Sequence, residues 1–164
     1  EDGEITMTVT VDQVQQVSEQ LESLERESEM LANLMWFECR GVPRDCEKAA
    51  VPWTVLNRVD SDRFPNTIAK VITQTSQFAY GENPHLNSAT KRALYAELKE
   101  IAKDVLTRWL FEKQGVEHVG RVLPEGYVYF ANHGDGRNWF RNKDSGGRYW
   151  NFILPDPYAA AEGE

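Results

Sequence analysis

The longest pattern in this 164-residue chain is an apolar repeat near its N-terminus. The repeat advances in steps of three and four residues, and Glu and Gln occupy most of the positions between its members. Its apolar members are Val14, Val17, Leu21, Leu24, Leu31 and Met35. This spacing predicts a long amphipathic helix in which Ser28 stands at the one step that lacks an apolar residue. The seam could pair with a partner helix as a coiled coil, but about three heptads are typical of a helix that packs on its own domain.

Further helix signals follow this first helix. We expect a second helix from about residue 46 to 59, in which Pro52 should kink the helix or shift its start. Asn66 or Thr67 can cap a short helix that ends near residue 73. Ser88 begins a third long helix that ends near residue 114. Residues 74–87, between these helices, read as a long loop of the kind that is often functional.

The C-terminal part of the chain changes character. Residues 127–130 and 149–153 are rich in aromatic and branched side chains, and we expect each to form a short strand, with residues 145–147 in the turn between them. A chain that begins with helices and ends with a small β element predicts an α+β fold.

The composition suits one domain and excludes several classes of partner. With 41 % apolar residues, a net charge of −8 and a pI near 5.0, the chain has neither the basic surface of a nucleic-acid-binding protein nor attraction for anionic membranes. No apolar stretch is long enough for membrane insertion, and no signal peptide is visible in this sequence. We expect a domain over residues 12–155 between flexible tails at 1–11 and 156–164.

Two cysteines, Cys39 and Cys46, stand on either side of a short loop. A disulfide between them is geometrically possible and would fix this loop, and the alternative is a pair of free thiols. Two cysteines without a neighbouring histidine do not supply the four ligands of a zinc site. The three histidines are scattered, so we expect no metal site and no cofactor.

Glu38 is the candidate catalytic residue, because it lies where the first helical pattern ends and is preceded by Trp36 and Phe37. Removing a carboxyl group from water disfavours its charged form and raises its pKa. A raised pKa is what a general acid working near neutral pH requires. The alternative is an ordinary surface glutamate at a helix end.

Several segments together resemble the catalytic domain of the SleB/CwlJ cell wall hydrolases, the spore-cortex-lytic enzymes and their phage and bacterial relatives. The likeness runs from about residue 30 to 153, in matching order. Its blocks are residues 38–43 (ECRGVP), 55–59 (VLNRV), 64–68 (FPNTI), 77–78 (QF), 129–132 (YFAN), Trp139 with Arg141, and 147–152 (GRYWNF). The chain departs from the family pattern at Cys39, Val42 and Pro52.

This resemblance implies a lysozyme-like domain that cleaves peptidoglycan between N-acetylmuramic acid and N-acetylglucosamine, at the bacterial cell wall, in an enzyme that is either bacterial or phage-encoded. The catalytic glutamate of the family falls on Glu38. Ordinary glycosidases use two carboxyl groups at a set separation, whereas no second one stands out in this sequence, and Glu82 is only the best spare candidate. We therefore expect Glu38 to act alone as a lytic transglycosylase that leaves 1,6-anhydro ends. Alternatives are a hydrolytic muramidase and a non-catalytic wall-binding or virion structural module that self-associates through its N-terminal helix.

Five further side chains are candidates for substrate binding. Gln77 and Tyr80, in the long loop, could orient the acetamido groups of the sugars. Tyr129 and Asn132 precede a Gly-rich stretch, and Trp139 could stack on a pyranose ring. Each of the five has an alternative role in local packing. Asn57 and Arg58, by contrast, are expected to fix the junction between a helix and a loop.

Overall fold

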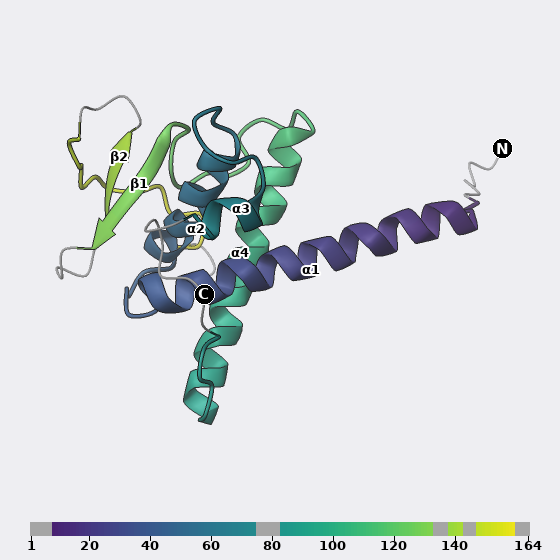
Figure 1. Cartoon of the computed structure of the whole chain (residues 1–164), viewed down its shortest axis with the longest axis horizontal. Coiled ribbons are helices and arrows are strands. Elements are labelled where there is room, and N and C mark those ends of the chain that lie inside the picture. Colours follow the sequence, from purple (N-terminus) through teal and green to yellow (C-terminus); the bar gives the residue numbers. More distant parts are fainter. Residues whose placement is uncertain (1–7, 75–82, 133–137, 143–146, 160–164) are drawn as a thin grey trace.

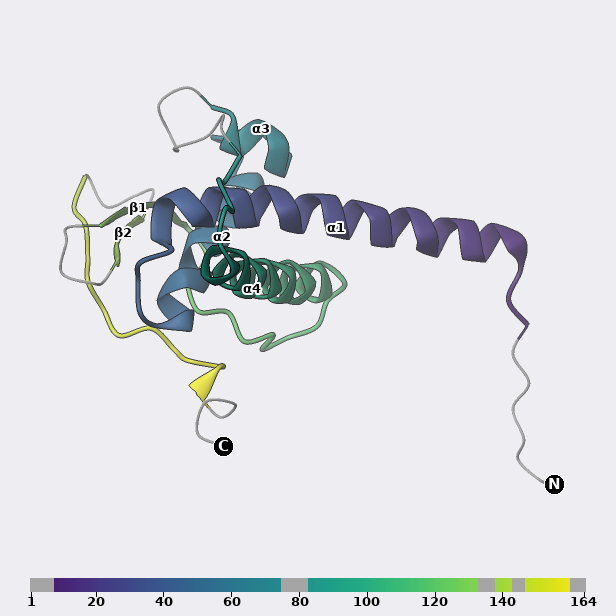
Figure 2. The same ribbon diagram turned by 90° about the horizontal axis from the view of Figure 1, so that it is seen from below.

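The computed structural model describes residues 8–74, 83–132, 138–142 and 147–159. Its elements are α1 (Val11–Cys39), α2 (Asp45–Val59), α3 (Ile68–Ile72), α4 (Ala89–Lys113), β1 (Tyr127–Asn132) and β2 (Asn138–Asn142). Helix α1 crosses α4, and α2 lies between α4 and the two-stranded sheet (Figures 1 and 2). The predicted α+β class, mostly helical with a small β element near the C-terminus, is confirmed.

Helix α1 divides into an exposed half and a buried half. It begins at a capping box, in which the Thr10 hydroxyl accepts the Gln13 N–H and the Gln13 side chain accepts the Thr10 N–H. Val14, Val17 and Leu21 remain 57 %, 52 % and 60 % exposed. From Ser28 onward one face of the helix is buried, and the N-terminal half projects away from the domain (Figures 1 and 2). The predicted helix is confirmed, but the expectation that it packs on its own domain holds only for its C-terminal half.

Helix α2 runs through Pro52, and the prediction that this proline would shift the helix start is wrong. Proline has no N–H, so the carbonyl of Lys48 loses its usual helical donor. The Cys39 thiol donates to that carbonyl, with 3.8 Å between sulfur and oxygen, and so joins the end of α1 to α2. Cys39 and Cys46 are both buried free thiols, as in the second of the two alternatives. Burial raises the pKa of the Cys39 thiol to about 12.

The other two helices begin where side-chain caps predict. The Thr67 hydroxyl accepts the Lys70 N–H at the start of α3, and the Ser88 hydroxyl accepts the Lys91 N–H at the start of α4. Helix α4 ends at Lys113 with Gln114 as its C-cap. Its buried residues pack into the same core as α1 and α2, and they are Leu98, Ile101, Ala102, Val105 and Leu106.

Strands β1 and β2 pair antiparallel, with Tyr129 opposite Arg141 and Asn132 opposite Asn138. The prediction of a strand over residues 149–153 is wrong. That segment forms only an isolated bridge, in which Phe140 and Trp150 exchange backbone hydrogen bonds of 2.8 and 2.7 Å. The second strand lies earlier in the chain, where Asn138 is held by contacts from α2. Its position is therefore set by tertiary contacts.

The segment after the bridge returns to the helices. The Tyr158 hydroxyl donates to Asp104 of α4 at 2.8 Å, and Arg44 at the start of α2 pairs with Asp156 at 3.3 Å. No helix within the described part of the chain is both long and apolar enough to cross a bilayer.

Candidate active site

Glu38 lies in the last turn of α1 and is half-buried. Trp36, two residues earlier, is buried, and Phe37 packs against the core. The Trp36 ring is held between Tyr95, with ring centroids 6.3 Å apart, and the Arg40 guanidinium, 4.9 Å from the centroid. Arg40 also donates to the Trp36 carbonyl at 2.7 Å. The turn that carries Glu38 is therefore fixed by apolar packing on one side and by Arg40 at its end.

A buried contact fastens the first turn of α2 to the start of β2. Glu47 accepts the Asn138 backbone N–H through Oε1 at 3.0 Å, and its carbonyl accepts the Asn138 side-chain amide at 2.9 Å. Both residues are almost fully buried. Since only residues 40–44 separate α1 from α2, this contact joins β2 to the first turn of the helix that follows Glu38.

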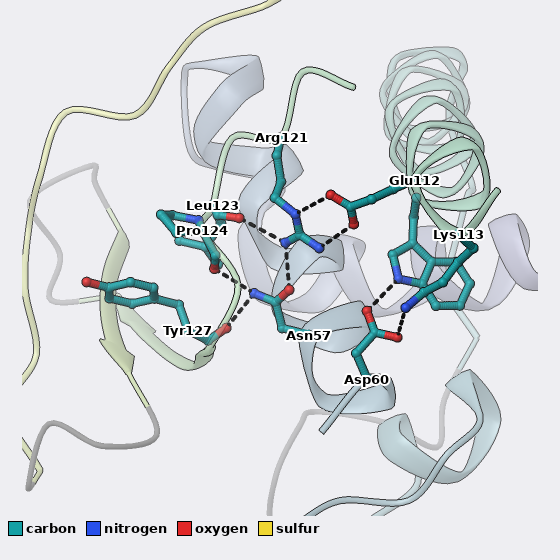
Figure 3. Close-up of polar contacts among 9 residues, drawn as sticks. Asn57, Asp60, Glu112, Lys113, Arg121, Leu123, Pro124 and Tyr127 are labelled. Carbon is teal, nitrogen blue, oxygen red and sulfur yellow. Dashed lines mark hydrogen bonds and ion pairs between the residues drawn. The ribbon is translucent and has the colours of Figure 1, made fainter. Parts of the chain in front are cut away.

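The last turn of α2 holds the start of β1. The Asn57 side-chain amide donates to the carbonyls of Pro124 and Tyr127 at 3.0 and 2.9 Å, and Arg58 Nε donates to the Val128 carbonyl at 2.6 Å. Figure 3 shows Asn57 at the centre of these contacts. The prediction that Asn57 and Arg58 fix a helix–loop junction is confirmed.

A second layer of ion pairs supports Asn57. Arg121 donates to the Asn57 amide oxygen at 2.7 Å and to Glu112 at 2.8 Å (Figure 3). The hydrogen bond from Arg121 holds the pKa of the Glu112 carboxyl below its usual value. Asp60 nearby pairs with Lys113 and accepts the Trp109 indole N–H at 2.9 Å. Asp60 is thus a structural residue at the end of α2.

Helix α2 contacts both faces of the sheet, through Glu47 on one face and Arg58 on the other. Alternate residues of a strand point to opposite faces, and Asn138 and Phe140 are buried on the face that Glu47 contacts. Trp139 and Arg141 therefore share the other face with Tyr129, the strand partner of Arg141. The Arg141 guanidinium lies 3.8 Å from the centroid of the Tyr129 ring. Two predicted substrate-binding residues, Tyr129 and Trp139, thus lie on one face of the sheet, and both are half-buried.

The other predicted site residues cannot be placed so closely. Gln77, Tyr80 and Glu82 lie outside the described residues. Asn132 ends β1 opposite Asn138, but its side chain is not among those described. Across the residues that the structure describes, no group of three His, Cys, Asp or Glu side chains could hold a metal ion.

Sequence reasoning missed the structural role of Glu47 and the position of Arg141. Glu47 reads as an ordinary acidic residue in the first turn of a helix, and nothing in its local sequence indicates that it bonds to a residue 91 positions away. Arg141 belongs to the blocks of the resemblance, but only the strand register shows that it stacks on Tyr129.

The sequence profile of the Cell Wall Hydrolase family matches residues 44–151, which is more than half of the chain. The chain belongs to this family. The match spans α2, α3, α4 and both strands of the cell wall hydrolase, and it begins six residues after Glu38. No curated protein and no solved structure matches the chain. Family membership makes the chain a peptidoglycan-degrading enzyme that acts at the cell wall, as the resemblance predicted.

Proposed function

We propose that this cell wall hydrolase cleaves the glycan strand of peptidoglycan between N-acetylmuramic acid and N-acetylglucosamine, as a lytic transglycosylase with Glu38 as its catalytic acid and base. Glu38 first donates its proton to the leaving glycosidic oxygen. The carboxylate then takes the proton of the 6-hydroxyl of the muramic acid residue, which attacks the anomeric carbon and closes a 1,6-anhydro ring. The acetamido group of the substrate stabilises the positive charge that develops at that carbon.

The placement of Glu38 supports this proposal most directly. It is a half-buried carboxylic acid at the end of α1, beside two buried or partly buried aromatic rings. The sheet that carries Tyr129 and Trp139 is fastened to the adjoining first turn of α2 by Glu47 and Asn138. An acid held on a rigid helix end is suited to transferring a proton to a bound sugar.

A single carboxylic acid is favoured because three acids of the described residues are engaged in holding the fold. Retaining and inverting glycosidases place two carboxyl groups across the bond that they cleave. Glu47 is buried against Asn138, Asp60 pairs with Lys113, and Glu112 pairs with Arg121. Since each of these carboxylates is committed to a structural contact, transglycosylation by Glu38 is preferred to hydrolysis by an acid pair.

The substrate-binding surface that we propose is the face of the sheet with Tyr129 and Trp139, together with Gln77, Tyr80 and Asn132. Aromatic rings present large apolar faces with a polar edge, which suits the mixed surface of a pyranose ring. Amide side chains such as those of Gln77 and Asn132 can both donate to and accept from an acetamido group.

The experiment that tests this proposal is the lysis of purified sacculi by the Glu38→Gln variant. An amide of the same shape cannot donate the proton, so we expect the lysis rate to fall by about three orders of magnitude. Glu22→Gln, an equivalent change on the exposed part of α1, serves as the matched control and should lyse at the wild-type rate. Both variants should keep the wild-type circular dichroism spectrum. Full activity of Glu38→Gln would refute the assignment.

The same assay separates the enzyme from a non-catalytic wall-binding module. A binding module would co-sediment with sacculi without reducing their turbidity, whether or not Glu38 is replaced. We expect the wild type to clear the suspension and Glu38→Gln to co-sediment without clearing it.

A further inference from the structure

Two guanidinium groups meet at the ring of Tyr129. Arg141, from the neighbouring strand, lies 3.8 Å from the ring centroid, and Arg58, from the end of α2, lies 5.0 Å from it. Arg141 also lies 5.7 Å from the centroid of Tyr149. Arginine stacks on aromatic faces in this way while its N–H donors remain in the plane of the guanidinium, at its edge.

Arg141 has no acidic partner among the described residues, and its guanidinium contacts two tyrosine rings instead. Arg44 pairs with Asp156, Arg108 with Asp104 and Arg121 with Glu112. The whole chain has 26 acidic against 18 basic residues, so acidic partners are abundant. The pKa of Arg58 is lowered to about 10, mainly by burial and in part by the charge of Arg141. Arg58 and Arg141 thus bring two like charges to one ring, and two like charges held together favour the binding of an anion.

We propose that Arg141, stacked between Tyr129 and Tyr149, binds the free carboxylates of the stem peptides that hang from the glycan strand. This inference rests on the proposed function, because it assumes that a glycan strand lies along the same face of the sheet. Arginine recognises carboxylates through paired N–H donors.

The test compares two substrates from a Gram-negative bacterium, whose sacculi carry no teichoic acid phosphate. One is intact sacculi, and the other is glycan strands from which an amidase has removed the stem peptides. We expect the wild type to cleave the stem-bearing strands about tenfold faster. Arg141→Gln should lose this preference, so that it cleaves the two substrates at equal rates, while Arg141→Lys should keep part of it. Arg26→Gln, on the exposed surface of α1, should behave as wild type.

A second experiment changes the substrate and leaves the protein unchanged. Converting the stem carboxylates of intact sacculi to amides, with carbodiimide and ammonia, should reduce the wild-type rate to that on bare strands. The proposal is overturned if the wild type does not distinguish amidated from untreated sacculi, or if Arg141→Gln slows both substrates equally. Those results would leave glycan cleavage by Glu38 intact. Loss of cleavage on every substrate with wild-type protein would instead refute the proposed function.

The exposed half of α1 carries a separate inference. Val14, Val17, Leu21 and Leu24 continue the seven-residue repeat. Of the acidic residues of this stretch, Asp12 and Glu19 fall at the outermost position of the repeat, and Glu22 also falls outside the apolar positions. A groove of about 370 Å³ beside Val17, Leu21 and Leu24 is completed by Leu110 and Gln114 of α4.

We infer that this seam pairs with the same seam of a second copy of the chain. Two copies with a net charge of −8 repel each other, so a self-complementary contact needs a strip without charge, and the seam between Val14 and Leu24 provides one. The two partner helices would cover the exposed valines and leucines of both copies.

Sedimentation of the full chain tests this pairing. We expect a dimer at concentrations of about 100 μM and a monomer after Leu21→Glu, which places charge in the seam. Gln16→Glu adds the same charge on a different side of the exposed helix and should leave the dimer intact. A wild-type monomer at this concentration, or a dimer that survives Leu21→Glu, would overturn the inference.

Discussion

The two halves of α1 follow one apolar repeat but lie in different surroundings. In the N-terminal half, Val14, Val17 and Leu21 are more than half exposed, whereas Leu31 and Met35 in the C-terminal half have no exposed surface. The second half carries Glu38 and is fixed to α2 through the Cys39 thiol. The repeat therefore determines that a helix forms, while the neighbouring elements determine which part of it is buried and can position a catalytic group.

The largest expected difference between the two halves of α1 is in the stability lost when the same residue type is shortened in each. Leu31→Ala removes buried side-chain atoms and should lower the free energy of unfolding by about 2–5 kcal/mol. Leu21→Ala removes mostly exposed atoms and should cost less than about 0.5 kcal/mol at protein concentrations too low for association. Urea denaturation of both variants measures the difference. Equal losses would mean that the N-terminal half is packed on the domain in solution.

Ser28 lies at the boundary between the two halves of α1. Its replacement by Ala should change the stability by a smaller amount, and should raise it. Its side chain is fully buried, and its hydroxyl has no hydrogen-bond partner among the described residues. Ser28→Ala removes this unsatisfied group and improves helix propensity, so we expect about 1 kcal/mol of added stability. Ser18→Ala, in the exposed half, controls for propensity and should add no more than about 0.5 kcal/mol. A loss of stability in Ser28→Ala would show that the hydroxyl has a partner in solution.

The smallest expected effect concerns the place where α1 leaves the domain. Glu25 forms ion pairs with Lys99 and Lys103 of α4, and the hydrogen bond from Lys99 lowers the pKa of its carboxyl below the ordinary value of 4.5. A carboxyl whose pKa is lower in the folded state stabilises the fold above its unfolded pKa, and this contribution is lost as the pH falls through the folded pKa.

We therefore expect Glu25→Gln to lower the melting temperature slightly at pH 7 and to have no effect once the pH is below the folded pKa of Glu25. Thermal denaturation across this pH range, with Glu22→Gln as the control, checks the prediction. A difference between wild type and Glu25→Gln that persists at low pH would show that the ion pairs do not account for it.

Local signals in the sequence were sufficient for the helices. Thr67 and Ser88 are side-chain caps whose function requires only residues three positions away, so both helix starts could be predicted. The strand at Tyr127 could also be predicted from its aromatic and branched residues. These features depend on neighbours in the chain, which the sequence displays directly.

The second strand and the exposed half of α1 could not be predicted because both depend on distant contacts. Residues 149–153 have more strand-forming side chains than Asn138–Asn142, yet Asn138 bonds to Glu47 and the later segment does not join the sheet beyond one bridge. The apolar repeat likewise does not show that α4 crosses α1 only beyond its first half. For the site, the sequence indicated Glu38, Tyr129 and Trp139 as candidates, but it did not show that Arg141 stacks on Tyr129.

The most direct test of glycan cleavage by Glu38 is mass spectrometry of the fragments released from sacculi by the wild type and by Glu38→Gln. Transglycosylation by a single acid predicts wild-type fragments that are lighter by one water than hydrolysis products and end in 1,6-anhydromuramic acid, with no fragments released by Glu38→Gln. Fragments with reducing ends only would contradict transglycosylation, and release by Glu38→Gln would contradict the role of Glu38 itself.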